Sequence, residues 1–140
     1  MKRALMLMTS VVFGTALIGC QSEPTSQQQF QQSVTGTVAY RERILLPDNA
    51  VVTVRLQDIS LADAPAVLLA EQVMETKGAQ VPFPYQLSYD AETIKPGHTY
   101  SVSARIEVNG KLRFITDTVY PVITDESLTH RRDLMLIGVR

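Results

Sequence analysis

The sequence predicts an all-β protein, an antiparallel β-sandwich of about seven strands. Three observations support this fold class. From Val34 onward, apolar residues recur at every second position, which is the spacing of strands and not of helices. Clusters of Gly, Pro, Asn and Asp separate the alternating segments at short intervals. Helical patterns do not alternate with the strands, and this favours antiparallel sheets over a parallel α/β arrangement.

The first two predicted strands cover residues 34–40 and 51–57. In the second strand, apolar side chains alternate with polar ones, so one face is expected to point toward the core. The core-facing residues of this strand are Val52, Val54 and Leu56. The turn between the two strands is marked by the sequence Pro-Asp-Asn at 47–49.

The third and fourth predicted strands cover residues 66–74 and 81–89. Propensity alone would also allow a helix in the third segment, and its short length and strand-rich surroundings favour a strand. The fourth contains Pro82 and Pro84, which cannot donate to a ladder, so it is expected to lie at a sheet edge or to begin irregularly. A single helical turn, capped by Asp90, is expected directly after it.

A β-hairpin is the clearest element of the pattern. Residues 100–108 and 111–116 both alternate, and only Asn109 and Gly110 separate them. This dipeptide is typical of a type I′ turn, because both turn positions need a positive φ. A seventh strand is expected over residues 133–139.

Residues 1–19 have the layout of a secretory signal peptide. A basic start is followed by an apolar run from Ala4 to about Ile18 and by the small residue Gly19. The tetrapeptide Leu-Ile-Gly-Cys that ends at Cys20 resembles the bacterial lipobox, so cleavage between Gly19 and Cys20 and acylation of Cys20 are expected, with palmitate-like chains. A membrane-spanning helix is disfavoured, because the run is shorter than about 20 residues and holds Ser and Thr.

The residue after Cys20 is Gln21 and not Asp, which resembles the sorting signal of outer-membrane lipoproteins. We therefore expect a lipid-anchored protein of the bacterial outer membrane that faces the periplasm. Residues 20–33 are rich in Gln and Ser and are expected to form a flexible tether. A helix in the tether, or docking of Phe30, is the alternative. The folded domain is expected over residues 34–140.

The charge balance excludes a nucleic-acid partner. Removal of Lys2 and Arg3 with the signal peptide moves the formal net charge from −1 to −3, and no large basic cluster is present. Cys20 is the only cysteine, so no disulfide and no thiolate metal site can form within the chain.

No catalytic residue, metal site, cofactor or small-molecule substrate is predicted. His98 and His130 lie in turn-like segments without metal-ligand spacing and are expected to be exposed. Asp58 and Asp63 lack the spacing of a calcium loop and are expected to cap loops.

The segment around Phe83 and Tyr85 combines rings and prolines on a predicted edge strand. It is the candidate edge for binding a protein partner. The alternative is that both rings pack internally, as part of an irregular strand.

Three segments resemble the YbaY family of bacterial lipoproteins. They are VTGTVAYRERILLPDNAVVTVRLQDISLADA from residue 34, PFPYQLSYD from residue 82 and PGHTY from residue 96, with a further match at TDTVYPVIT. That family is grouped with YscW-like lipoproteins, the pilot chaperones of type III secretion. The resemblance implies a β-sandwich lipoprotein that escorts a protein client, and it supplies no catalytic residues.

Two functions are therefore open. The first is a non-enzymatic binding or chaperone module that holds a protein client of the cell envelope. The alternative is a lipoprotein that binds envelope polysaccharide or peptidoglycan through exposed rings. The tyrosines available for that role are Tyr40, Tyr85, Tyr89 and Tyr120.

Overall fold

The computed structural model describes residues 14, 19 and 31–140. Residues 31–140 form an all-β domain, which confirms the predicted fold class. The signal peptide and most of the expected tether, Cys20 included, lie outside the described residues; Gly19 is described as exposed and irregular.

The strands follow the predicted order, with one addition. Their bounds are β1 Gln31–Tyr40, β2 Ala50–Asp58, β3 Val67–Glu75, β4 Phe83–Asp90, β5 Tyr100–Val108, β6 Lys111–Ile115, β7 Pro121–Val122 and β8 Leu134–Gly138. A short 3-10 helix, η1 (Ala91–Thr93), follows β4, and Asp90 caps it as expected by accepting the N–H of Glu92. The third predicted segment is a strand and not a helix.

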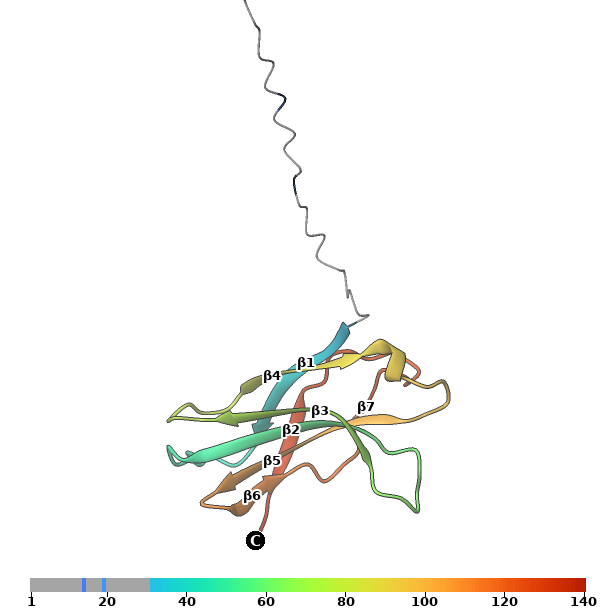
Figure 1. The fold of residues 1–140 in the computed structure, drawn as a ribbon. Coiled ribbons are helices and arrows are strands. Elements are labelled where there is room, and N and C mark those ends of the chain that lie inside the picture. The colour runs from blue at the N-terminus through green and yellow to red at the C-terminus, as the bar shows by residue number, and fades with distance from the viewer. Residues whose placement is uncertain (1–13, 15–18, 20–30) are drawn as a thin grey trace, which may run out of the picture.

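The strands are hydrogen-bonded in the order β3-β2-β5-β6-β8-β1-β4, with the two-residue β7 attached to β5. The curled sheet has two layers, one containing β1 and β4 and the other containing β2, β3 and β5 (Figure 1). β8 links the layers because it pairs with β6 on one side and with β1 on the other. The result is a nearly closed, barrel-like sheet.

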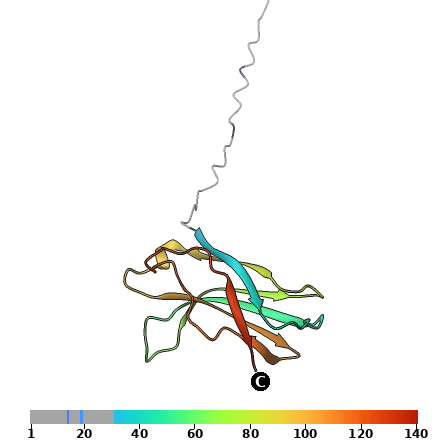
Figure 2. The same ribbon diagram turned by 180° about the vertical axis from the view of Figure 1, so that it is seen from behind.

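One pairing departs from the expected antiparallel pattern. β8 runs parallel to β1, with Val38 opposite Leu134 and Tyr40 opposite Leu136 (Figure 2). The chain reaches β8 through a long segment after β7, residues 123–133, which carries it back to the end of the domain where β1 begins. A parallel neighbour needs such a long crossover, whereas an antiparallel neighbour can follow a tight turn.

The core lies between the layers and is built mainly from aliphatic side chains and tyrosines. The predicted inward face of β2 is confirmed, because Val52, Val54 and Leu56 are fully buried. Gly36 is required where β1 meets the segment before β8, because a Cβ there would lie 1.7 Å from the carbonyl oxygen of Arg132.

The predicted hairpin turn is confirmed, since Asn109 and Gly110 have φ values of 52° and 75°. The main differences from the sequence predictions concern β1 and β7, and the other strand bounds shift by at most two residues. β1 begins at Gln31, so residues 31–33, expected in the tether, are part of the sheet and pair with β4. The strand β7 was not predicted, because two residues that include Pro121 show no alternation.

Candidate partner-binding seam

β3 and β4 are the two edge strands of the sheet, although they are consecutive in the chain. They lie beside each other without forming a backbone ladder, and we call the space between them the β3–β4 seam (residues 67–75 and 83–90). An unpaired strand edge presents backbone N–H and C=O groups that another extended chain can pair with. The prediction that residues 81–89 include an edge strand is therefore confirmed.

The hydrogen bonds of β1 establish which groups of β4 face the seam. Thr35 donates to His130 and accepts from Arg132, so its backbone groups point away from β4. Gln86 is the ladder partner of Thr35, and in an antiparallel pair such residues both point outward. By alternation, the seam-facing residues of β4 are Pro84, Gln86, Ser88 and Asp90.

The N-terminal half of β4 has no free backbone N–H to offer to a partner strand. Pro84 has no backbone N–H. The N–H of Gln86 donates to the side-chain oxygen of Gln72 on β3, at 2.8 Å. In the other half, Ser88 and Asp90 face the seam with no partner strand. The open part of the edge is therefore short and lies at the end of β4 that leads into η1.

A pocket of about 340 Å³ lies beside this open half. One wall is apolar and comes from the start of β3, where Val67 and Leu68 are 59% and 50% exposed. The opposite wall comes from the end of β4 and the following segment, with Asp90 and Lys95. Exposed apolar side chains next to unpaired backbone are typical of an interaction site.

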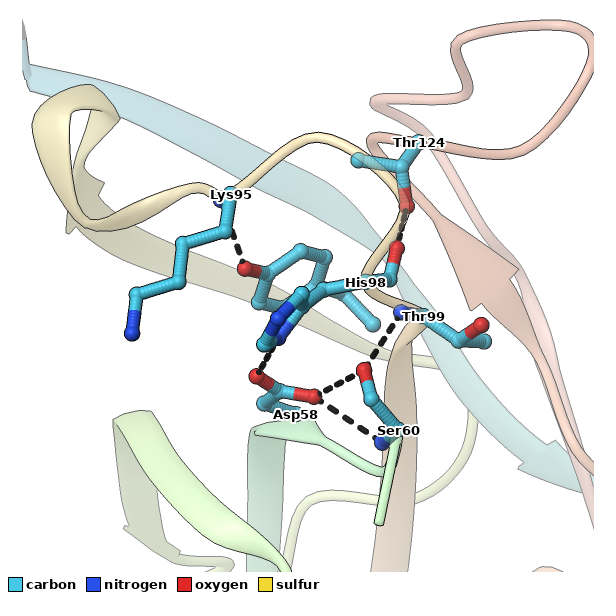
Figure 3. Close-up of polar contacts among 7 residues, drawn as sticks. Asp58, Ser60, Lys95, His98, Thr99 and Thr124 are labelled. Carbon is cyan, nitrogen blue, oxygen red and sulfur yellow. Dashed lines mark hydrogen bonds and ion pairs between the residues drawn. The ribbon is translucent and has the colours of Figure 1, made fainter.

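A polar network fixes the segment that forms one side of this pocket. The Asp58 carboxylate accepts hydrogen bonds from the N–H and hydroxyl of Ser60. His98 Nδ1 lies 2.7 Å from the other carboxylate oxygen, and because a carboxylate only accepts, Nδ1 is the donor. Figure 3 shows His98 and Ser60 on opposite sides of Asp58, with the Lys95 ammonium group extending away from them.

The same segment is held at two further points. Thr124 donates its hydroxyl to the His98 carbonyl at 2.6 Å, and the Lys95 N–H donates to the Tyr100 hydroxyl at 2.9 Å (Figure 3). The chain from Lys95 to Thr99 is thereby tied to β2, β5 and the segment after β7. A pocket wall held in this way needs little ordering when a partner binds.

The hydrogen-bond network around Asp58 has a structural role. Hydrogen bonds from Ser60, and then from His98, lower the pKa of Asp58 to about 2. A serine nucleophile needs a histidine base within hydrogen-bonding reach. Here the Ser60 hydroxyl donates to Asp58, and the same hydroxyl oxygen accepts a hydrogen bond from the N–H of Thr99 at 2.8 Å. The hydroxyl therefore forms hydrogen bonds that hold the loop in place. The expectation that Asp58 caps a loop is confirmed, whereas His98, expected to be exposed, is partly buried.

Phe83 and Tyr85, the two rings proposed as a partner-binding edge, are not exposed. Phe83 and Tyr85 are 6% and 3% exposed, and the Tyr85 hydroxyl donates to the Arg132 carbonyl at 2.6 Å. Both rings point into the core because odd-numbered residues of β4 face inward. The alternative, that they pack internally, is the correct one. The part of β4 that is open lies further along the strand, at Ser88 and Asp90.

The tyrosines considered for carbohydrate binding also have internal roles. Tyr40 and Tyr89 are buried, and Tyr40 stacks on Phe114 with ring centroids 4.1 Å apart. Tyr120 is partly buried against the core, and its hydroxyl contacts the backbone of Met135. His130 binds the Leu128 carbonyl and the Tyr89 hydroxyl. None of these rings forms an exposed stacking platform in residues 31–140.

A second apolar pocket, of about 280 Å³, is lined in part by Gly138 and Val139, near the C-terminus. Ile44 and Leu45 contribute its most exposed apolar side chains. Its strands are internal to the sheet, so it offers side chains but no open backbone edge. Within residues 31–140, no three His, Cys, Asp or Glu side chains gather as a metal site. No described helix is long and apolar enough to cross a membrane.

The fold and the seam define a small all-β protein with an open edge suited to binding a partner chain. Residues 29–136 match the family model described as type III secretion system lipoprotein chaperone (YscW), and the chain belongs to this family. It is 45% identical over 117 residues to the "Uncharacterized lipoprotein YbaY" of Escherichia coli (strain K12). That match covers 83% of this chain and 60% of the relative, so the chain spans less than two thirds of the relative's length.

A solved structure extends the comparison. It is that of an alternative pilotin from the type II secretion system of Vibrio cholerae, which is 65% identical and superimposes with a TM-score of 0.77. The match covers 79% of this chain and 98% of the pilotin. The family model and the relative are both described as lipoproteins, and the family model and the solved structure are described as a secretion chaperone and a pilotin, in keeping with the resemblance.

Proposed function

We propose that this protein is a pilotin-like lipoprotein that holds or escorts a protein client of the cell envelope. The observation that carries the proposal is the 65% identity and shared fold with a type II secretion pilotin. The open β3–β4 seam supports it, because an edge of this kind can receive an extended segment of another protein. The chain works by binding and not by catalysis, in keeping with a structural Asp58 network.

The proposal includes the anchor predicted from the sequence. Acylated Cys20 holds the protein on the outer membrane, on the periplasmic side, and residues 21–30 connect the lipid to β1. Each buried acyl methylene contributes about 0.8 kcal/mol, and stable anchoring takes more than one chain, which a lipoprotein cysteine provides. The anchor keeps client and domain close to the same membrane.

Affinity capture of the full-length acylated protein tests this function. Cells expressing the parent or Cys20→Ala are labelled with a palmitate analogue and treated with a short cross-linker, and the protein is captured from both membrane and soluble fractions. The expected result is label on the parent alone and one envelope protein enriched with the parent in membranes. Equal label in both, or no envelope protein above the untagged background, contradicts the proposal.

A further inference from the structure

We infer that the client binds by strand addition to the open half of β4, at Ser88 and Asp90, as an extended segment that carries an apolar side chain. The inference rests on the proposed function, because it assigns the client a binding mode and a local chemistry. Three features of the seam support it: the direction of the free backbone groups, the two residues that close the rest of the edge, and the exposed apolar wall of the pocket.

The free backbone groups define where a new strand can pair. Ser88 faces the seam with both its N–H and its C=O, and Asp90 faces it with its N–H, since the Asp90 carbonyl already accepts the Thr93 hydroxyl at 2.6 Å. Added strands gain affinity from such main-chain hydrogen bonds. The site therefore fits a few residues of extended chain, which pair beside Ser88.

The remainder of the edge excludes a longer strand. Pro84 cannot donate, and Gln72 already occupies the N–H of Gln86. Prolines and covered groups are the means by which proteins blunt edges against unspecific pairing. Because only the half next to the pocket stays open, a client is selected by side chains as well as by its backbone.

The pocket defines the side chains of the client. Val67 and Leu68 provide an exposed apolar wall, which suits one aliphatic side chain. The ionisable groups that line the pocket are two carboxylates, Asp58 and Asp90, and one ammonium group, Lys95, so the pocket does not favour an acidic side chain. The apolar wall therefore defines the client chemistry: an extended segment with an aliphatic side chain.

Two synthetic peptides serve as probes, acetylated and amidated, of sequence TVTVT and TSTST. Binding is followed by the amide NMR signals of the full-length acylated protein in detergent micelles. We expect shifts at Leu68, Ser88 and Asp90, with the valine peptide binding several-fold more tightly than the serine peptide, because Val67 and Leu68 form an apolar wall. Shifts confined to the pocket around Ile44 and Leu45, or equal binding of both peptides, overturn the inference.

The decisive variant is Ser88→Pro, with Ser88→Ala as its matched control. Proline removes a seam-facing N–H that the folded domain does not use, so the β1–β4 ladder and the melting temperature should be preserved. Peptide binding should fall about tenfold or more in Ser88→Pro and stay near parental in Ser88→Ala. Equal binding by both variants overturns strand addition.

The same two variants separate this inference from the proposed function. If Ser88→Pro captures the envelope client as well as Ser88→Ala does, the protein is a client-binding lipoprotein that does not use this edge. If the parent captures no client at all, the proposed function itself fails. Loss of the client in Ser88→Pro alone supports both.

Discussion

The side-chain oxygen of Gln72 accepts a hydrogen bond from the backbone N–H of Gln86 at 2.8 Å, across two strands that share no backbone ladder. One glutamine thus takes the place of a strand partner and closes the middle of the β3–β4 seam. A buried or half-buried donor that loses its partner costs about 1–3 kcal/mol, whereas one that is hydrated costs less. Because this hydrogen bond is exposed, its loss is expected to cost an amount near the lower end of that range.

Replacing Gln72 with Ala should expose the Gln86 amide to water. We expect faster hydrogen exchange at Gln86 and a loss of about 1 kcal/mol in the free energy of unfolding. Gln86→Ala is the control, because it removes an exposed side chain and leaves the backbone N–H in place. If the Gln86 amide exchanges equally fast in the parent and in Gln72→Ala, the seam is held by other contacts.

Pro84 is predicted to protect the edge from self-association. Pro84→Thr restores an N–H that faces the seam and lengthens the free edge of β4. We expect this variant to form dimers and larger species at concentrations where the parent is monomeric, as measured by light scattering. Ser88→Thr, a neighbouring substitution that adds no donor, should behave as the parent does. Monomeric Pro84→Thr would show that edge protection does not depend on this proline.

The hairpin turn gives a prediction for stability. Gly110 has a φ of 75°, and a Cβ there would meet no atom within 4 Å, so only backbone conformation limits the residue. Gly110→Val should cost about 1–3 kcal/mol, because a β-branched residue is strained at positive φ. Gly110→Asn should cost less, since Asn tolerates this conformation. Equal urea midpoints for parent and Gly110→Val would contradict the turn geometry.

The Asp58 network predicts a pH dependence of stability. The folded-state pKa of about 2 lies below the usual value of 3.8, so the folded protein favours the carboxylate. The resulting stabilisation is fully present above the usual value and is lost as the pH falls through about 2. Asp58→Asn should therefore be less stable than the parent at neutral pH, and the two should converge below pH 2. Urea unfolding across this range measures the difference, and a constant difference would argue against the carboxylate as its source.

Much of the fold could be predicted from residues that alternate or turn in a characteristic way. Val52, Val54 and Leu56 gave the inward face of β2, and Asn109-Gly110 gave the hairpin. These features depend on neighbours in sequence, through strand periodicity and backbone φ. The parallel pairing of β8 with β1 depends on a long crossover, and local pattern does not encode it.

The candidate site was predicted in part. Pro84 correctly marked an edge strand, but the rings of Phe83 and Tyr85 proved to be core residues. The alternation of β4 does indicate its inward face, because Phe83, Tyr85, Leu87 and Tyr89 are large and mainly apolar whereas the residues between them are Pro or polar. The meeting of Asp58 with His98 joins the end of β2 to a segment 40 residues away, and no local signal predicts such a contact.

Through acylated Cys20, this protein is proposed to keep an envelope protein at the outer membrane. The most direct measurement is the amount of the captured client in purified outer membranes from cells without the gene, and from such cells supplied with the parent or with Cys20→Ala. We expect a several-fold loss of the client from this fraction without the gene, restored by the parent and not by Cys20→Ala. Equal amounts in all three would contradict it.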